Sequence, residues 1–259
     1  MDSRTDIIGW VIQYCRSHGL DYYTTDYGVF IRGDSIRIVR EMPRNSISMV
    51  FTDPPYGVTK DVYDNLLIFK RILPYIYNVM ENNSWLVIYW SVKNLDKFFK
   101  CMFETKFEYY YQLIGLMQGS GALSVFGQRR YIPIFIFRKG TPNIMYRRHD
   151  VLICDELPNI RIKIGDPLFK PTYTNALILS MLYSHGTLLD PFAGLGSIPL
   201  SCEYLGIPWI AIEIQKQKYE KAIELISLFK ENKLFNTSRQ NNERKENKAT
   251  ITNWIGKNN

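Results

Sequence analysis

The chain contains little cysteine and no long apolar run. Its four cysteines are scattered among 259 residues and include no CxxC pair, which argues against a zinc site or a disulfide framework and favours a reducing compartment. No apolar run approaches the roughly 20 residues that a membrane-spanning helix needs. The N-terminus lacks a basic stretch followed by an apolar core, so no signal peptide is expected. We therefore expect a cytoplasmic globular protein without a metal site or a membrane segment.

Positive charge is in excess and is unevenly distributed. The chain has 32 Lys and Arg against 25 Asp and Glu, a net charge of +7. Residues 127–150 carry six basic residues against one acid, and residues 230–259 carry seven against three, so the rest of the chain has a net charge of −2. Localised basic charge is what a nucleic-acid-binding protein needs, although a solvated face has the same composition. The polar tail at 231–259 is expected to be disordered.

Apolar runs of strand length alternate with stretches of helical periodicity. Strands are expected at 28–32, 47–52, 85–90, 107–117, 131–137, 187–192 and 209–214. Helices are expected at 6–17, 35–42, 61–80 with an interruption at Pro74, 94–103, 174–183, 197–205 and 216–231. This order predicts an α/β fold with a doubly wound, mostly parallel, seven-stranded sheet. Strands 107–117 and 131–137 would form an antiparallel hairpin joined by a Gly/Ser loop, and an irregular basic stretch would follow it.

The strand at 187–192 ends in a glycine turn that has the features of a ligand site. The turn reads DPFAGLGS over 190–197, and its two glycines let the backbone approach a ligand closely. It is not the dinucleotide fingerprint, because Pro199 stands where the third glycine would fall. Asp190 at the strand end suits an ammonium or sulfonium ligand, and Glu213 ends the next strand, where an acid accepts ribose hydroxyls. The alternative is an ordinary strand–turn–helix with a capping acid.

A second motif, TDPPYG at 52–57, ends the strand at 47–52. Its two prolines remove two N–H donors and rigidify the backbone, so that the local carbonyls face outward as acceptors. A carboxylate, a fixed carbonyl and an aromatic ring then lie within four residues. That array suits a planar amine, whose N–H protons go to Asp53 and the Pro54 carbonyl while Tyr56 stacks on the ring. Taken alone, the motif is also compatible with a polar turn.

The two motifs in this order resemble those of the class-β DNA amino-methyltransferases, the permuted group that acts on exocyclic amines. In that family a D/N/S-P-P-Y motif precedes a D-P-F-x-G-x-G motif. Here TDPPYG is followed by FKP at 169–171, by DPFAGLGS at 190–197 and by the ribose-binding acid Glu213. Gly33-Asp34 matches the Gly-Asp that precedes the catalytic strand in the family.

The resemblance implies a Rossmann-like methyltransferase fold with S-adenosylmethionine as the cofactor. The implied catalytic residues are Asp53, Pro54, Pro55 and Tyr56. The implied cofactor-binding residues are Asp34, Asp53, Lys170, Asp190, Phe192, Gly194, Gly196, Ser197, Glu213 and Ile214. The resemblance covers residues 28–230, which are expected to form the methyltransferase domain with a short basic target-recognition segment (127–165). The helical N-terminal extension (1–27) and the tail (231–259) have no counterpart in it.

The implied reaction is methyl transfer to the exocyclic amine of a base flipped out of double-stranded DNA. Attack through carbon 5 of cytosine is excluded, because it requires a cysteine that typically follows a proline and none of the four cysteines does. In the family, Asp at the first position of the motif favours adenine N6. Methylation of cytosine N4, methylation of an RNA base, and a catalytically silent nucleic-acid-binding protein of the same fold stay open.

The basic segment between the two motifs lies where the family places target recognition. Phosphate contacts are therefore expected from Arg129, Arg130, Arg147 and Arg148, with a solvated basic loop as the alternative. The segment is short for a recognition domain, which favours a homodimer or a short target sequence. A cognate restriction endonuclease is the further partner that the family suggests.

Overall fold

The computed structural model describes residues 7–57, 65–117, 122–124, 126–154, 164 and 169–230. Its helices are α1 (Ile7–His18), α2 (Ser35–Glu41), α3 (Leu66–Val79), α4 (Leu95–Phe103), α6 (Thr172–Leu182), α7 (Ser197–Leu205) and α8 (Lys216–Lys230). Its strands are β1 (Tyr22–Thr24), β2 (Gly28–Arg32), β3 (Ile47–Thr52), β4 (Met80–Tyr89), β5 (Glu108–Met117), β6 (Ala122–Ser124), β7 (Gly127–Arg129), β8 (Tyr131–Lys139), β9 (Val151–Cys154), β10 (Leu188–Asp190) and β11 (Trp209–Glu213). The tail at 231–259, for which disorder is expected, lies outside the described residues.

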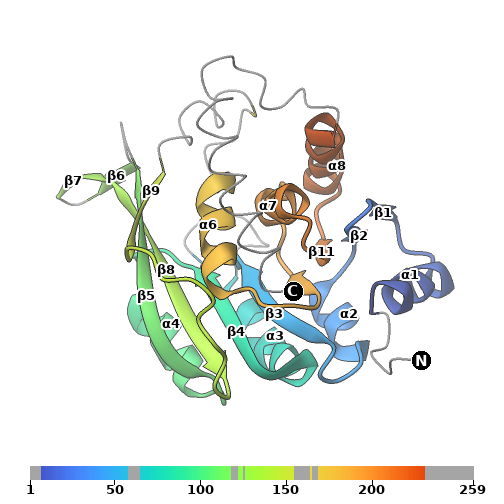
Figure 1. Cartoon of the computed structure of the whole chain (residues 1–259), viewed down its shortest axis with the longest axis horizontal. Coiled ribbons are helices and arrows are strands. Elements are labelled where there is room, and N and C mark those ends of the chain that lie inside the picture. The colour runs from blue at the N-terminus through green and yellow to red at the C-terminus, as the bar shows by residue number, and fades with distance from the viewer. Residues whose placement is uncertain are drawn as a thin grey trace.

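The main sheet confirms the predicted fold but contains nine strands rather than seven. Its order is β1-β2-β11-β10-β3-β4-β8-β5-β9 (Figure 1), so the seven predicted strands lie side by side and β1 and β9 are added at the two edges. Both added strands are short, and the residues of β9 are alternately exposed and buried. Neither strand therefore forms a continuous apolar run that the sequence analysis could detect. Strands β1 and β8 run antiparallel to their neighbours and all other pairs are parallel.

The antiparallel hairpin of β5 and β8 is confirmed. The connection between them was expected to be a loop, but it includes a second small hairpin formed by β6 and β7. This small hairpin projects from the body of the molecule at the end of β5 and β8 (Figure 1). The stretch after β8, expected to be irregular, carries β9, which pairs with the end of β5.

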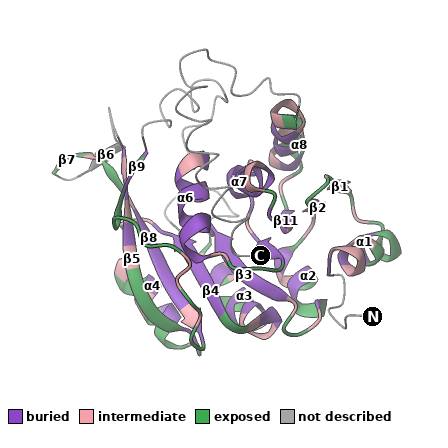
Figure 2. Ribbon diagram, in the orientation of Figure 1, coloured by how far each residue is buried: buried purple, intermediate pink, exposed green. Residues whose placement is uncertain are grey.

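Helices cover both faces of the sheet. Helices α1 to α4 pack on one face and α6 to α8 on the other, each over its own apolar cluster. Along β11, Trp209 and Ala211 point into one cluster while Ile210 and Ile212 point into the other. The central strands are therefore buried on both sides (Figure 2), which explains why they are continuous apolar runs in the sequence.

One prediction about α3 and one about β4 were wrong. Helix α3 continues through Pro74 without interruption, because Ile72, Leu73 and Ile76 on both sides of the proline are buried in the core. Strand β4 begins at Met80, directly after α3, rather than at residue 85. The expected start of the helix at 61–64 lies outside the described residues.

The sheet topology brings the ends of separate strands together. Strands β2, β11, β10, β3, β4 and β5 point in one direction, and we call the rim where they end the carboxyl edge. Thr52, Asp190 and Glu213 are the last residues of β3, β10 and β11 and lie on this rim. Strand β8 runs the opposite way, so it begins at the carboxyl edge, just after Arg129 and Arg130. The chemistry-bearing residues are expected at this rim.

Candidate active site

A buried hydrogen bond joins the two motifs that the sequence singled out. The Thr52 hydroxyl at the end of β3 donates to Asp190 Oδ1 at the end of β10, over 2.7 Å, although 138 residues separate them in the chain. The Phe192 N–H donates to the same oxygen over 3.2 Å. Asp190 is only 1% exposed, so its carboxyl group holds the glycine turn against the neighbouring strand. The role of Thr52 was missed by the sequence reasoning, although its position at a strand end was a signal.

The environment of Asp190 is acidic. The pKa of Asp190 is raised to about 7. Burial is the largest cause, and the charges of Asp53 and Glu213 also raise this pKa, whereas the hydrogen bonds from Thr52 and Phe192 lower it. Three carboxyl groups thus converge at the ends of adjacent strands. Such a cluster favours a cationic ligand, because a positive charge relieves the repulsion among the acids.

Glu213 holds the other side of the glycine turn. Its carboxylate accepts the Gly194 N–H at Oε2 over 2.9 Å and the Gln215 N–H at Oε1 over 2.7 Å. Burial, the largest cause, raises the pKa of Glu213. Gly194 has a φ of +54° and Gly196 a φ of +77°, which favour glycine, and a Cβ at Gly194 would meet nothing within 4 Å. The turn therefore leaves open space beside a buried acid.

The other predicted cofactor residues lie at the same rim. Phe192 is half-buried in the turn, and Ile214, which follows β11, is 46% exposed. Ser197 is buried at the first turn of α7, whose N-terminus follows the glycine turn. Asp34 caps α2 by accepting the Ile36 N–H over 2.9 Å, and its side chain is exposed. An exposed apolar side chain, a glycine turn and a ribose-type acid fit the adenosine part of S-adenosylmethionine.

The aspartate of the TDPPYG motif forms an ion pair. Lys170 Nζ donates to Asp53 Oδ2 across 117 residues of sequence. The Lys170 side chain is 11% exposed, and its nitrogen lies 5.9 Å from the centre of the Tyr56 ring and 5.5 Å from that of Tyr89. The resemblance implied that Lys170 binds the cofactor, and the structure places its ammonium on the Asp53 carboxylate. No local sequence signal connects the two residues.

Tyr56 is held by the residues that follow β4. Its ring meets Trp90 edge-on at 5.0 Å between centroids, and Trp90 stacks on Phe98 of α4 at 4.4 Å. The Tyr56 carbonyl accepts a hydrogen bond from Asn94 Nδ2 over 3.3 Å. The sequence reasoning missed Trp90 and Asn94, yet Trp90 follows a continuous apolar strand, which is a position worth inspecting in a parallel sheet. Asp53 and the Tyr56 ring are thus presented together at the carboxyl edge.

The four predicted DNA-binding arginines fall into two separate pairs. Arg129 is the last residue of β7 in the small hairpin, and Arg130 joins it to β8, where the Arg130 carbonyl accepts the Met117 N–H over 2.7 Å at the carboxyl edge. Arg147 and Arg148 lie between β8 and β9 and are exposed. The Tyr146 N–H, just before this pair, donates to the carbonyl of Met181, near the end of α6 that lies away from the carboxyl edge, and the Asp150 carbonyl, just after it, accepts the Ile114 N–H of β5. The two pairs therefore lie on different segments of the chain.

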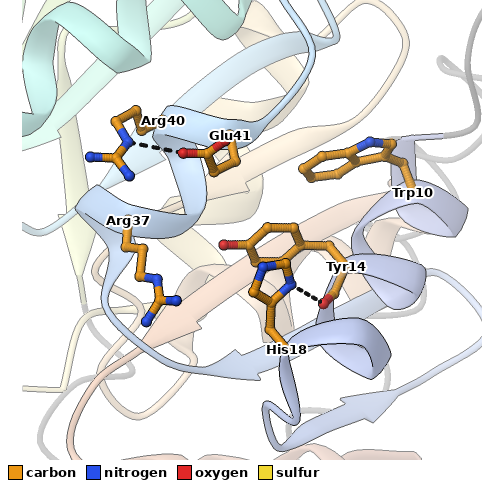
Figure 3. A pocket seen from close by; sticks show the side chains of 6 residues that line it. All are labelled: Trp10, Tyr14, His18, Arg37, Arg40 and Glu41. Atoms are coloured by element: carbon orange, nitrogen blue, oxygen red, sulfur yellow. Dashed lines mark hydrogen bonds and ion pairs between the residues drawn. The ribbon is translucent and has the colours of Figure 1, made fainter.

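A hollow of about 460 Å³ lies away from these motifs, between α1 and α2 (Figure 3). It is lined by Trp10, Tyr14, His18, Arg37, Arg40 and Glu41 and contains none of the predicted site residues. Among the described residues, no group of His, Cys, Asp and Glu is placed to hold a metal ion. None of the described helices is long and apolar enough to cross a membrane.

The chain is similar in sequence to two proteins that are named as a methylase and a methyltransferase. It is 26% identical over 204 residues to the protein named "Putative methylase YubD" of Escherichia coli K12, and the match covers 74% of this chain and 87% of that protein. It is 24% identical over 232 residues to the type II methyltransferase M.HpaI of Haemophilus parainfluenzae, which covers 75% of this chain and 72% of that protein. No protein-family profile matches the chain.

Solved structures share the fold. The PvuII DNA methyltransferase, which is cytosine-N4-specific, superposes with a TM-score of 0.65 at 17% identity over 92% of this chain and 95% of that one. The complex of M1.HpyAVI with S-adenosylmethionine superposes with a TM-score of 0.60 at 18% identity over 76% and 98%. The chain is thus similar in sequence to proteins named as a methylase and a methyltransferase, and similar in fold to the PvuII DNA methyltransferase. The Rossmann-like methyltransferase fold predicted from the two motifs is confirmed.

This similarity gives a context to the contacts at the carboxyl edge. Strand β3, which leads into TDPPYG, precedes strand β10, which leads into DPFAGLGS; this is the motif order of the permuted DNA amino-methyltransferases, and the sheet sets the two strands next to each other. The hydrogen bond from Thr52 to Asp190 connects the ends of these two strands. The motif that presents Asp53 therefore adjoins the turn that carries Gly194 and Gly196.

Proposed function

We propose that this protein transfers a methyl group from S-adenosylmethionine to the exocyclic amine of a flipped-out DNA base, with adenine N6 as the substrate. One observation carries the proposal. Strand β3, which leads into the TDPPYG motif, pairs with strand β10, which leads into the DPFAGLGS turn, and the Thr52–Asp190 hydrogen bond joins the two. The chain thus presents an amine-binding array next to a turn suited to a cationic nucleoside.

The residues at the rim fit the cofactor. Glu213 would accept the ribose hydroxyls, Phe192 and Ile214 would flank the adenine ring, and the open side of Gly194 would let the ligand approach the backbone. When bound, S-adenosylmethionine supplies an electrophilic methyl group on a positively charged sulfur. The convergence of Asp53, Asp190 and Glu213 suits that charge.

The catalytic motif would aim a weak nucleophile. The lone pair of an amino group on adenine is delocalised into the ring, so the chain must orient it. Asp53 and the Pro54 carbonyl would accept the two N–H protons, and Tyr56, which is held by Trp90, would stack on the base. Orientation of this kind contributes up to about 7–11 kcal/mol to barrier lowering at ideal alignment. Asp53 would also stabilise the positive charge that develops on the nitrogen and accept the proton after transfer.

The choice of adenine rests on the Asp at the first position of the motif. Cytosine N4 is the second candidate, because the PvuII enzyme, named as cytosine-N4-specific, has the same fold over 92% of this chain. Both bases present the same kind of amine to Asp53 and Tyr56. A homodimer and a cognate restriction endonuclease stay predictions from the family.

The test is a transfer assay with tritiated S-adenosylmethionine and separate DNA and RNA acceptors. We expect label in DNA, abolished transfer in Asp53→Ala, and cofactor binding that survives in that variant by calorimetry. The matched control is Asp26→Ala, because Asp26 is 77% exposed and lies before β2, at the opposite edge of the sheet. Label in RNA but never in DNA would overturn the substrate, and loss of cofactor binding in Asp53→Ala would overturn the assignment of the motif.

A further inference from the structure

Lys170 lies in an unusual position for a lysine. The residue is only 9% exposed, and lysine is almost never buried unless it is paired. Its ammonium group contacts Asp53 Oδ2 and lies 5.9 Å from the centre of the Tyr56 ring and 5.5 Å from that of Tyr89. Burying a long flexible side chain costs conformational entropy and desolvation. A specific pairing with Asp53 and the two ring faces offsets that cost.

The charges that face Asp53 from the neighbouring elements differ in sign. Asp190 at the end of β10 and Glu213 at the end of β11 are both buried acids, and their charges disfavour a further carboxylate at this rim. Lys170, just before α6, brings a positive charge into direct contact with Asp53. An opposite charge at contact distance favours the ionised form of a carboxyl group, whereas like charges and burial favour the protonated form.

We propose that Lys170 is a positioning residue that keeps the Asp53 carboxylate ionised and directed at the carboxyl edge, and thereby sets the acid limb of the pH–rate profile. The inference rests on the proposed function and deepens it. An ionised Asp53 can accept hydrogen bonds from the N–H groups of the target amine, and a protonated one would present a donor in their place. Lys170 takes no part in bond making and acts through Asp53 alone.

The test compares Lys170→Gln with Lys170→Arg at saturating S-adenosylmethionine between pH 5 and pH 9. In Lys170→Gln we expect the acid limb of kcat to move to higher pH by about one unit or more, which lowers the rate about tenfold on that limb. Lys170→Arg should restore the wild-type limb, because it keeps the charge. Affinity for the cofactor should change less than about threefold. A tenfold or greater loss of cofactor affinity with an unmoved acid limb would overturn the proposal and assign Lys170 to the cofactor.

A second measurement needs neither cofactor nor DNA. We expect the melting temperature of Lys170→Gln at pH 8 to fall, and the additional substitution Asp53→Asn to recover part of the loss, since it removes the carboxylate that was left unpaired. Additive losses in the double variant would overturn the pairing. The two failures are distinguishable, because absence of transfer by the wild type refutes the proposed function, whereas additive melting temperatures refute only the role of Lys170.

Discussion

The protonation of Asp190 provides a sharp test of the electrostatics at the carboxyl edge. Asp190 is fully buried, and its pKa is raised to about 7 from an ordinary value of 3.8. Between these two values the unfolded chain has released the proton that the folded chain retains. The free energy of unfolding must therefore fall as pH rises through this window and level off above pH 7.

The size of the effect follows from the pKa. Each pKa unit corresponds to about 1.4 kcal/mol, so the contribution of Asp190 to the free energy of unfolding falls by up to about 3 kcal/mol between pH 4.5 and pH 8. Asp190→Asn does not ionise, and it keeps an oxygen that can accept the hydrogen bonds of Thr52 and Phe192. The variant should lose this part of the pH dependence and gain stability relative to wild type at pH 8.

Urea unfolding at pH 4.5 and pH 8 measures this difference, with S-adenosylmethionine absent. The control is Asp26→Asn, the same substitution at a side chain that is 77% exposed, which should leave the pH dependence close to that of wild type. If Asp190→Asn and wild type lose the same free energy of unfolding between the two pH values, Asp190 is not held protonated, and the account in which burial and the neighbouring acids raise its pKa is refuted.

Two further predictions concern packing and DNA contact. Gly28→Ala would place a Cβ 2.3 Å from the Trp209 ring and 2.5 Å from the Trp209 carbonyl oxygen. We therefore expect the free energy of unfolding, measured in urea, to fall by about 3 kcal/mol. A loss below about 0.5 kcal/mol would show that the β2–β11 contact is looser than described. Charge reversal of Arg129 and Arg130 should lower the slope of log binding constant against log salt concentration for DNA by up to about two. The same change at Arg147 and Arg148, the pair before β9, should lower that slope less. Equal slopes for the two double variants would place the DNA elsewhere on the surface.

The long elements of the fold were predictable from the sequence because their burial is continuous or periodic. Strands such as β3 and β11 are buried at every residue, and so they are visible as apolar runs. The edge strands β1 and β9 are short and partly exposed, so that only their pairing with β2 and β5 makes them strands. The continuity of α3 through Pro74 also depends on tertiary packing, which overrides the local preference of proline to end a helix.

The candidate site was predictable in its motifs but not in its contacts. The glycine turn and TDPPYG are local patterns, so their positions at strand ends followed from the sequence. The ion pair of Lys170 with Asp53 and the bond of Thr52 to Asp190 span 117 and 138 residues, and no local pattern encodes them. Strand order alone brings these groups together. For the same reason the sequence could not separate the two arginine pairs, which the sheet places in different positions.

The most direct test of the central claim is to identify the methylated nucleoside. Plasmid DNA is incubated with the protein and S-adenosylmethionine, digested to nucleosides and analysed by mass spectrometry, with the inactive Asp53→Ala variant as the blank. The account predicts N6-methyldeoxyadenosine in the wild-type digest and none in the blank. N4-methyldeoxycytidine would contradict the assignment of the base, and the absence of any methylated nucleoside would contradict the assignment of the carboxyl edge as a methyl-transfer site.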